Sequence, residues 1–172
     1  MRFLTSAESH DWASGHSIAL NQSGRPARNV DGLVTRRWMF PSVAQLNWWA
    51  GYISKALTPR HKCLAWVTDF EIFQSGENQH LYYRLRQSYG DLRLLHEAPG
   101  HLFLEHEAAD LATVLGLSVL NSWDVHVLPE LQYGGPDTAR AFICHDGWFE
   151  LSHRDVETVS EWERALHNLS TA

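Results

Sequence analysis

RAFICHDGWFELSH, residues 140 to 153, contains the strongest signal for the fold. Asp146-Gly147 separates two runs of alternating residues, and such a dipeptide indicates a β-hairpin with a two-residue type I′ turn. In that register His145 lies directly opposite Trp148. The side chains that then share one face, which we expect to be buried, are Phe142, Cys144, Phe149 and Leu151. The stretch therefore predicts two antiparallel strands near the C-terminus.

Apolar periodicity in the rest of the chain predicts about four helices and further strands. Spacings of three and four residues indicate helices at about 43–57, 75–90, 108–120 and 155–169. Strand patterns occur at 33–40, 63–73 and 124–128, with two more between 92 and 106. The order βαβαββαβββα around one mixed or mostly antiparallel sheet is an α+β fold, which we expect to form one domain over 1–172. We expect flexible loops at 21–32 and 130–138, where Gly and Pro interrupt polar residues.

HEAPGHLFLEHE, residues 96 to 107, raises the question of a metal site, since it contains three histidines and three glutamates. A helical zinc site needs ligands at i and i+4, but His96 and His101 are five residues apart with Pro99-Gly100 between them. The stretch instead predicts a β-hairpin. A four-residue connection would place His96 opposite His101 and create a possible two-ligand site, whereas a two-residue turn would pair His96 with Phe103. We therefore expect no bound metal and no other cofactor.

A small hydrolase or metal-dependent enzyme is the alternative interpretation. Asp69 and Glu71 share one face of the strand at 63–73, and His80 follows in the next helix. Two carboxylates and a histidine are suited to acid–base chemistry, with His96 and His101 as further ligands. The same carboxylates equally suit a solvent-exposed face or ion pairs with arginines. The nucleotide and hydrolase signatures GxGxxG, GxxxxGK[ST] and GxSxG are absent from the sequence, and we expect no catalytic activity.

Composition and charge narrow the possible partners. The 172 residues are 44% hydrophobic and 20% charged, with 8 tryptophans and a net charge of −6. An acidic chain disfavours nucleic acid, because phosphate binding depends on Lys and Arg. No apolar run approaches the roughly 18 residues of a membrane span, and charged residues interrupt the first 12 positions, unlike a signal peptide. With two cysteines, which we expect to be reduced and buried, these features predict a cytoplasmic protein without membrane partners.

The helix at 43–57 contains the most unusual feature of the sequence. Val43, Leu46, Ala50, Ile53 and Leu57 form one apolar stripe, with Trp49 beside it. Trp48 and Tyr52 fall on roughly the opposite side. Large aromatic side chains away from a core face are typical of interfaces. Trp48 and Tyr52 are therefore the first candidates for a binding surface.

Tyr83 and Arg84 are secondary candidates, because they face outward in the helix expected at 75–90. Together these patterns predict a noncatalytic module that binds another protein or itself. The acidic charge and modest length are similar to those of small bacterial immunity-type proteins, an analogy of size and charge alone, and a regulatory role fits equally well.

Overall fold

A computed structural model describes residues 1–40, 42–57, 62–70, 77–130 and 139–170. Within these ranges the strands are β1 Arg2–Leu4, β2 Val34–Met39, β3 Cys63–Phe70, β4 Gly100–Phe103, β5 Trp123–Pro129, β6 Ala139–Cys144 and β7 Trp148–His153. The α-helices are α1 Ser6–Gly15, α2 Leu46–Leu57, α3 Glu77–Ser88, α4 Ala108–Leu120 and α5 Val156–Ser170. Two short 3₁₀ helices, at Val43–Gln45 and Glu105–Glu107, precede α2 and α4.

The seven described strands form one sheet in the order β1-β4-β3-β5-β6-β7-β2, and every neighbouring pair is antiparallel. The α+β prediction is therefore confirmed. The described ranges contain five α-helices rather than about four, because β1 and α1 were not anticipated. A signal for α1 was present in the sequence: Thr5 and Glu8 form a capping box, in which each side chain accepts a hydrogen bond from the other residue's backbone N–H.

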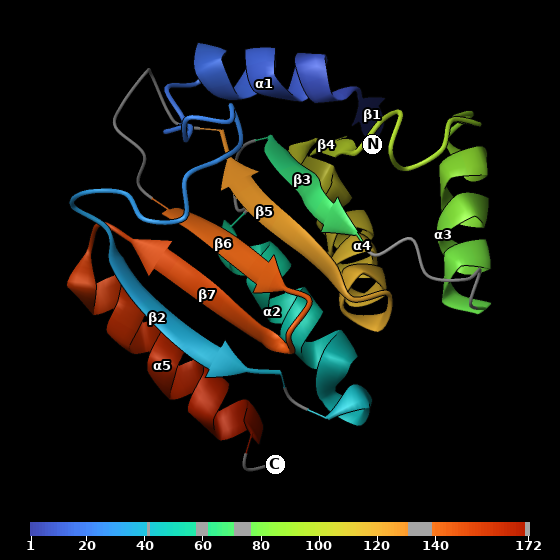
Figure 1. Cartoon of the computed structure of the whole chain (residues 1–172). Coiled ribbons are helices and arrows are strands. Elements are labelled where there is room, and N and C mark those ends of the chain that lie inside the picture. Colours follow the sequence, from blue (N-terminus) through green and yellow to red (C-terminus); the bar gives the residue numbers. More distant parts are fainter. Residues whose placement is uncertain (41, 58–61, 71–76, 131–138, 171–172) are drawn as a thin grey trace.

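The two faces of the sheet are covered by different helices. On one face α2, α4 and α5 lie side by side over the strands (Figure 1), and the larger apolar core fills this layer. On the other face α1 crosses one end of the sheet, over a smaller core that includes Leu4, Leu64 and Trp66. Alternation along β3 explains the division, because Leu64 and Trp66 belong to the smaller core while Ala65 and Val67 belong to the larger one.

The hairpin of β6 and β7 is present, but the predicted register is wrong by one residue. Cys144, not His145, pairs with Trp148, so the loop contains three residues. Gly147 closes it with φ of 87°, a left-handed conformation typical of such three-residue hairpin loops. Because side chains alternate, this shift changes which of them share a face. The core face consists of Ala141, Ile143, Phe149 and Leu151. Phe142 and Cys144 lie on the opposite face with Trp148.

The hairpin predicted at 96–107 does not form. Residues 95–97 make a turn. The strand that follows, β4, pairs with β1 and β3 and not with the residues immediately before this turn. Gly100 lies at the start of β4 because a side chain there would collide with the Ser9 hydroxyl of α1 and with Leu4. The other end of the stretch is the 3₁₀ helix Glu105–Glu107.

Of the two segments expected to be loops, 21–32 lies within the described residues. The segment 21–32 contains a turn in which the Asn21 side chain accepts hydrogen bonds from the backbone N–H groups of Ser23 and Arg25. It then places Arg28 against the rings of Phe142 and Trp148. The other predicted loop, 130–138, lies outside the described residues except for Glu130.

Candidate functional site

Helix α2 presents one aromatic side chain to solvent. Its inward stripe is buried as expected: Leu46, Trp49, Ala50, Ile53 and Leu57 are all in the larger core, together with the Ser54 side chain. The side chain of Val43 lies outside the described set. Trp48, one position before the buried Trp49, is 72% exposed. The fold of α2 therefore does not depend on burying Trp48.

Tyr52 is only partly outside the core. Its ring is half-buried and packs against the edge of the larger core, so the expectation that it lies opposite the inward stripe is only partly met. Burial raises the pKa of the Tyr52 hydroxyl, and the negative charge of Glu161 on α5 acts in the same direction. Glu161 of α5 thus lies near the Tyr52 hydroxyl.

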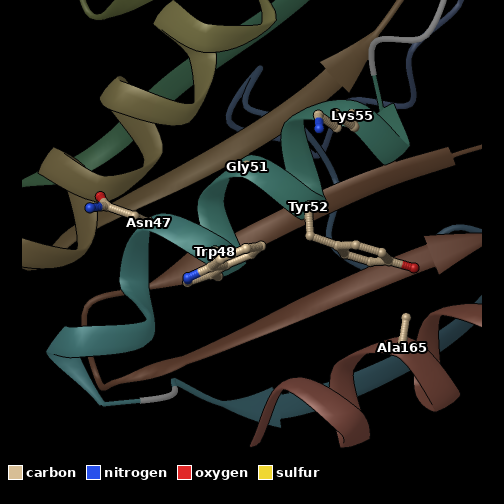
Figure 2. Close-up of a pocket in the computed structure, with 6 residues that line it drawn as sticks. All are labelled: Asn47, Trp48, Gly51, Tyr52, Lys55 and Ala165. Carbon is tan, nitrogen blue, oxygen red and sulfur yellow. The ribbon is translucent and has the colours of Figure 1, made fainter. Parts of the chain in front are cut away.

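A shallow cavity of about 550 Å³ lies between α2 and α5. The described residues that line it are Asn47, Trp48, Gly51, Tyr52, Lys55 and Ala165. Figure 2 shows the rings of Trp48 and Tyr52 extending from α2 on the side of α5, with the Ala165 methyl group directed toward Tyr52. We call this cavity the α2–α5 groove. Its depth comes from two small residues, since Gly51 has no side chain and Ala165 has only a methyl group.

Gly51 is a position where a substitution can fill the groove. A Cβ atom added at this position would have no heavy atom within 4 Å, and the backbone is ordinary helix. A longer side chain at position 51 would therefore extend into the groove without disturbing the core. Gly116, in the middle of α4, also has open space around its Cβ position but does not line the groove.

The two secondary candidates lie elsewhere. Tyr83 and Arg84 belong to α3, which stands at the opposite end of the sheet from α5 (Figure 1). Tyr83 is half-buried, and its hydroxyl accepts a hydrogen bond from the Leu95 N–H at 3.3 Å. Arg84 is exposed. Neither residue joins the α2–α5 groove.

The residues of the enzymatic alternative do not form one site in the described structure. Asp69 is exposed at the end of β3, His80 is exposed on α3, and Glu71 lies outside the described residues. His96 is exposed and lines a separate hollow beside α1. His101 is completely buried on β4.

Both ring nitrogens of His101 are engaged by protein groups. The Tyr82 hydroxyl donates to Nε2 at 2.8 Å, and Nδ1 donates to the Ala65 carbonyl at 3.2 Å. Tyr82 in turn accepts a hydrogen bond from the buried guanidinium of Arg86. Burial, with a contribution from the Arg86 charge, lowers the pKa of His101 to about 4. His101 is therefore a neutral histidine of the core, with no nitrogen left for a metal.

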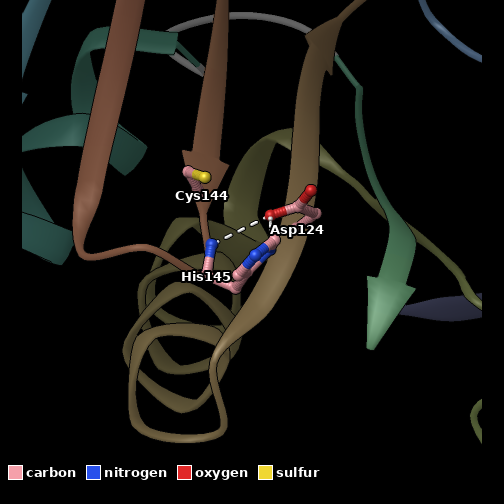
Figure 3. Close-up of side chains that lie close together, drawn as sticks. All are labelled: Asp124, Cys144 and His145. Atoms are coloured by element: carbon pink, nitrogen blue, oxygen red, sulfur yellow. Dashed lines mark hydrogen bonds and ion pairs between the residues drawn. The ribbon is translucent and has the colours of Figure 1, made fainter. Parts of the chain in front are cut away.

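A cluster that was not anticipated lies at the turn between β6 and β7. Asp124 of β5 accepts hydrogen bonds from both the backbone N–H and the ring Nδ1 of His145, at 2.9 Å and 2.8 Å. Figure 3 shows these two side chains facing each other, with the Cys144 sulfur on the side that faces Asp124. Ligand atoms of the three residues all lie within 4.8 Å of one another. In the sequence, the Asp-Gly turn accounts for His145 and Asp146, and no pattern connects them with β5.

The charges around this cluster favour a cation. The hydrogen bond to Asp124 and the charge of that carboxylate raise the pKa of His145, and the charges of Asp146 and Asp69 add to the effect. Burial raises the pKa of the Cys144 thiol to about 11. Cys144 and His145 therefore do not form a reactive thiolate pair in the described structure, because a catalytic cysteine needs a lowered pKa.

Comparison with known proteins adds no assignment, since no protein-family model, curated protein or solved structure matches this chain. Within the described ranges, no helix has the length and apolar character needed to cross a membrane.

Proposed function

We propose that the protein is a noncatalytic binding module whose α2–α5 groove receives an apolar side chain of a positively charged partner protein. The main support is the exposure of Trp48, at 72%, beside a cavity of about 550 Å³ on a helix whose core stripe is already complete. Tryptophan and tyrosine are the residues most enriched at binding hot spots, because they bury a large area at a small cost in conformational entropy.

A protein fits the groove better than a small molecule does. Small-molecule sites usually bury about 70–90% of the ligand surface. The groove has one wall, Trp48, that is itself mostly exposed, so it cannot enclose a ligand. A partner protein would instead insert one side chain between Trp48 and Tyr52 and cover the rest of the exposed ring with its own surface.

Charge favours a basic partner over a second copy of this chain. The net charge is −6, so two copies repel each other at long range, whereas a basic protein is attracted. The α5 side of the groove is locally acidic, because Glu157 and Glu161 precede Ala165 at helical intervals of four residues and are exposed. Lys55 is the single basic side chain among the described residues that line the groove.

Binding of this kind would neutralise or regulate the partner, as in an immunity-type protein. We also place the protein in the cytoplasm. This location is supported by Cys63 and Cys144, which are both buried and not joined in a disulfide. Reduced thiols are typical of that compartment.

Site-specific photo-crosslinking tests the proposal. A photoreactive phenylalanine analogue replaces Trp48 in the full chain, expressed in its native host, and crosslinked products are identified by mass spectrometry. We expect one predominant partner with an isoelectric point above 7, whose affinity for the purified protein falls as salt is raised. Gly51→Gln should abolish this binding by filling the groove, while Gly116→Gln, a matched helical glycine, should leave it intact.

Three outcomes would contradict the proposal. Crosslinking of one copy to another, with a dimer in light scattering that Trp48→Ser dissociates, would show self-association instead. An acidic partner would exclude the electrostatic argument. Equal affinity of the wild type and Gly51→Gln would place the interface outside the groove.

A further inference from the structure

Three neighbouring strands bring acidic, sulfur and imidazole groups together on the face of the sheet opposite α2, α4 and α5. Asp69 of β3 pairs directly with Asp124 of β5. Cys144 ends β6, the next strand in the sheet, and His145 follows it. Like charges directly opposite each other on antiparallel strands destabilise a sheet. The pairing of Asp69 with Asp124 is therefore a position where a bound cation would be favourable.

The chemistry of the donor atoms selects the kind of cation. A thiolate, an imidazole and a carboxylate together suit zinc and the later first-row transition metals, whereas calcium and magnesium prefer sites made only of oxygen. We propose that Asp124, Cys144 and His145 form a binding site for a divalent transition metal, with Zn²⁺ as the ion of choice. This site is independent of the α2–α5 groove, and it was not predicted from the sequence.

The geometry is close to what a zinc ion requires. The three ligand atoms lie within 4.8 Å of one another. Around a tetrahedral zinc ion with bonds of about 2.0–2.3 Å, ligand atoms are separated by about 3.5 Å. Small side-chain adjustments therefore suffice: the widest separation has to shorten, and the 2.8 Å between His145 Nδ1 and Asp124 has to lengthen slightly. The Asp124 side chain is already held beside His145 by the hydrogen bond that its carboxylate accepts from the His145 backbone N–H.

His145 has a carboxylate beside each ring nitrogen. Nδ1 is 2.8 Å from an Asp124 oxygen, and Nε2 is 3.3 Å from an Asp146 oxygen. If Nδ1 binds the ion beside Asp124, the Nε2–H can donate to Asp146, an arrangement that orients histidine ligands in zinc proteins. The Cys144 thiol lies 3.7 Å from Asp146 and would pass its proton to water as the sulfur binds the ion.

Metal titration of the full chain, purified and then treated with a chelator, tests the site. We expect Zn²⁺ to raise the melting temperature and to saturate at one ion per chain. Co²⁺ should produce a thiolate-to-metal charge-transfer absorption band, which reports a bound sulfur ligand directly. His145→Gln should weaken zinc binding at least about tenfold, by analogy with the loss of other zinc-site groups.

Matched variants separate a metal ligand from a structural residue. His145 is exposed, so His145→Gln should fold normally, which circular dichroism without metal checks. Cys144→Ser retains the buried Cys63 as the remaining thiol, and it should lose the charge-transfer band. His80→Gln removes an exposed histidine of α3 and should change neither binding nor spectrum.

Several results would overturn the inference. Zinc affinity in the millimolar range, or binding that survives both His145→Gln and Cys144→Ser, would exclude these ligands. Equal stabilisation by Ca²⁺ and Zn²⁺ that persists in Cys144→Ser would show a site made of carboxylates alone.

Discussion

Two tryptophans on the surface of the protein have opposite environments. Trp148, at the start of β7, is covered by two guanidinium groups, with Arg37 at 3.8 Å and Arg28 at 4.8 Å from its ring centre. Both arginines are held by the Glu150 carboxylate. Trp48 is 72% exposed, and it lines a groove with its ring uncovered.

The ring of Trp148 is thus covered by side chains of the protein itself, whereas most of Trp48 faces solvent. Arg28 comes from the segment at 21–32 and Arg37 from β2, so distant parts of the sequence converge on Trp148. Cation–π contacts of this kind contribute about 0.5–1 kcal/mol each at exposed sites. Among the described residues no comparable cation lies over the ring of Trp48, although Lys55 lines the same groove. This contrast supports the proposal that a partner protein contacts the exposed ring of Trp48.

The largest expected effect distinguishes Trp48 from its neighbour. Trp49 is 2% exposed and contacts the rings of Phe40 and Phe149. Trp49→Ser should destabilise the fold by about 3–5 kcal/mol, because it leaves a large cavity in the core. Urea unfolding measures the change. If Trp49→Ser is tolerated, the assignment of inward and outward faces on α2 is wrong, and the binding proposal loses its main support.

Trp148→Ser should cost less, about 2 kcal/mol, because the ring is half-buried and its loss removes two cation–π contacts together with packing on Phe142. Thermal and urea unfolding should agree on the loss. Arg37→Met, which keeps much of the length of the side chain but not its charge, should reproduce only part of it. A stability change as small as that of Trp48→Ser would remove the contrast between the two tryptophans.

Local patterns predicted the parts of the fold that depend on neighbours in sequence. The stripe of α2 and the existence of the β6–β7 hairpin follow from short-range spacing, and both are correct. The register of the hairpin is not, because Asp-Gly is compatible with a two-residue turn and also with the three-residue loop that includes His145. A shift of one residue then exchanges the two faces of one strand, here β6, while Phe149 and Leu151 of β7 lie in the core as expected.

The missed features depend on long-range contacts. The groove needs Ala165 of α5, which is far from α2 in sequence and faces it only in the folded structure, and the Asp124–His145 contact needs β5 and β6 to pair. Helix α3 exposes the apolar Leu81 and buries the charged Arg86. The buried charge is offset by Asp91 and Tyr82, partners that the helical pattern alone does not reveal.

The turn that precedes Trp148 provides the third test. Gly147 has φ of 87°, and a Cβ there would meet open space, so the cost of Gly147→Val is backbone strain alone. We expect a loss of more than about 1 kcal/mol, since β-branched residues resist the left-handed conformation. Gly147→Asn is the control and should cost less, because asparagine adopts this conformation more readily. Coincident urea midpoints for Gly147→Val and the wild type would contradict the turn geometry.

Acid should lower the stability of the fold through His126. The His126 ring packs on Phe142, whose ring also contacts Arg28. Burial, aided by the charges of Arg140, Arg28 and Arg25, lowers the pKa of His126 to about 3. Between pH 6.5 and 3 the unfolded chain binds a proton that the folded chain excludes, so stability falls as pH falls. The loss approaches about 1.4 kcal/mol per pH unit at its steepest for one histidine.

His126→Phe should flatten part of this pH dependence, measured as the melting temperature from pH 7 to pH 4. The remaining slope should include His101, whose pKa is also lowered by burial, to about 4. His10→Gln, at an exposed histidine, is the control and should leave the profile unchanged. An unaltered profile in His126→Phe would mean that His126 is protonated in the folded protein.

The smallest expected effect on stability is that of Trp48→Ser. Substitutions of exposed residues usually change stability by no more than about 0.5 kcal/mol, and the inward stripe of α2 is complete without Trp48. The same change should weaken partner binding by about 2 kcal/mol or more, as is usual for aromatic residues at the centre of an interface. Tyr52→Ser should affect both properties, because that ring is half-buried against the core. A melting curve and a binding isotherm on the same variants separate the two roles. If Trp48→Ser lowers the melting temperature as much as Trp148→Ser does, Trp48 stabilises the fold, and the exposed ring is no evidence for a partner.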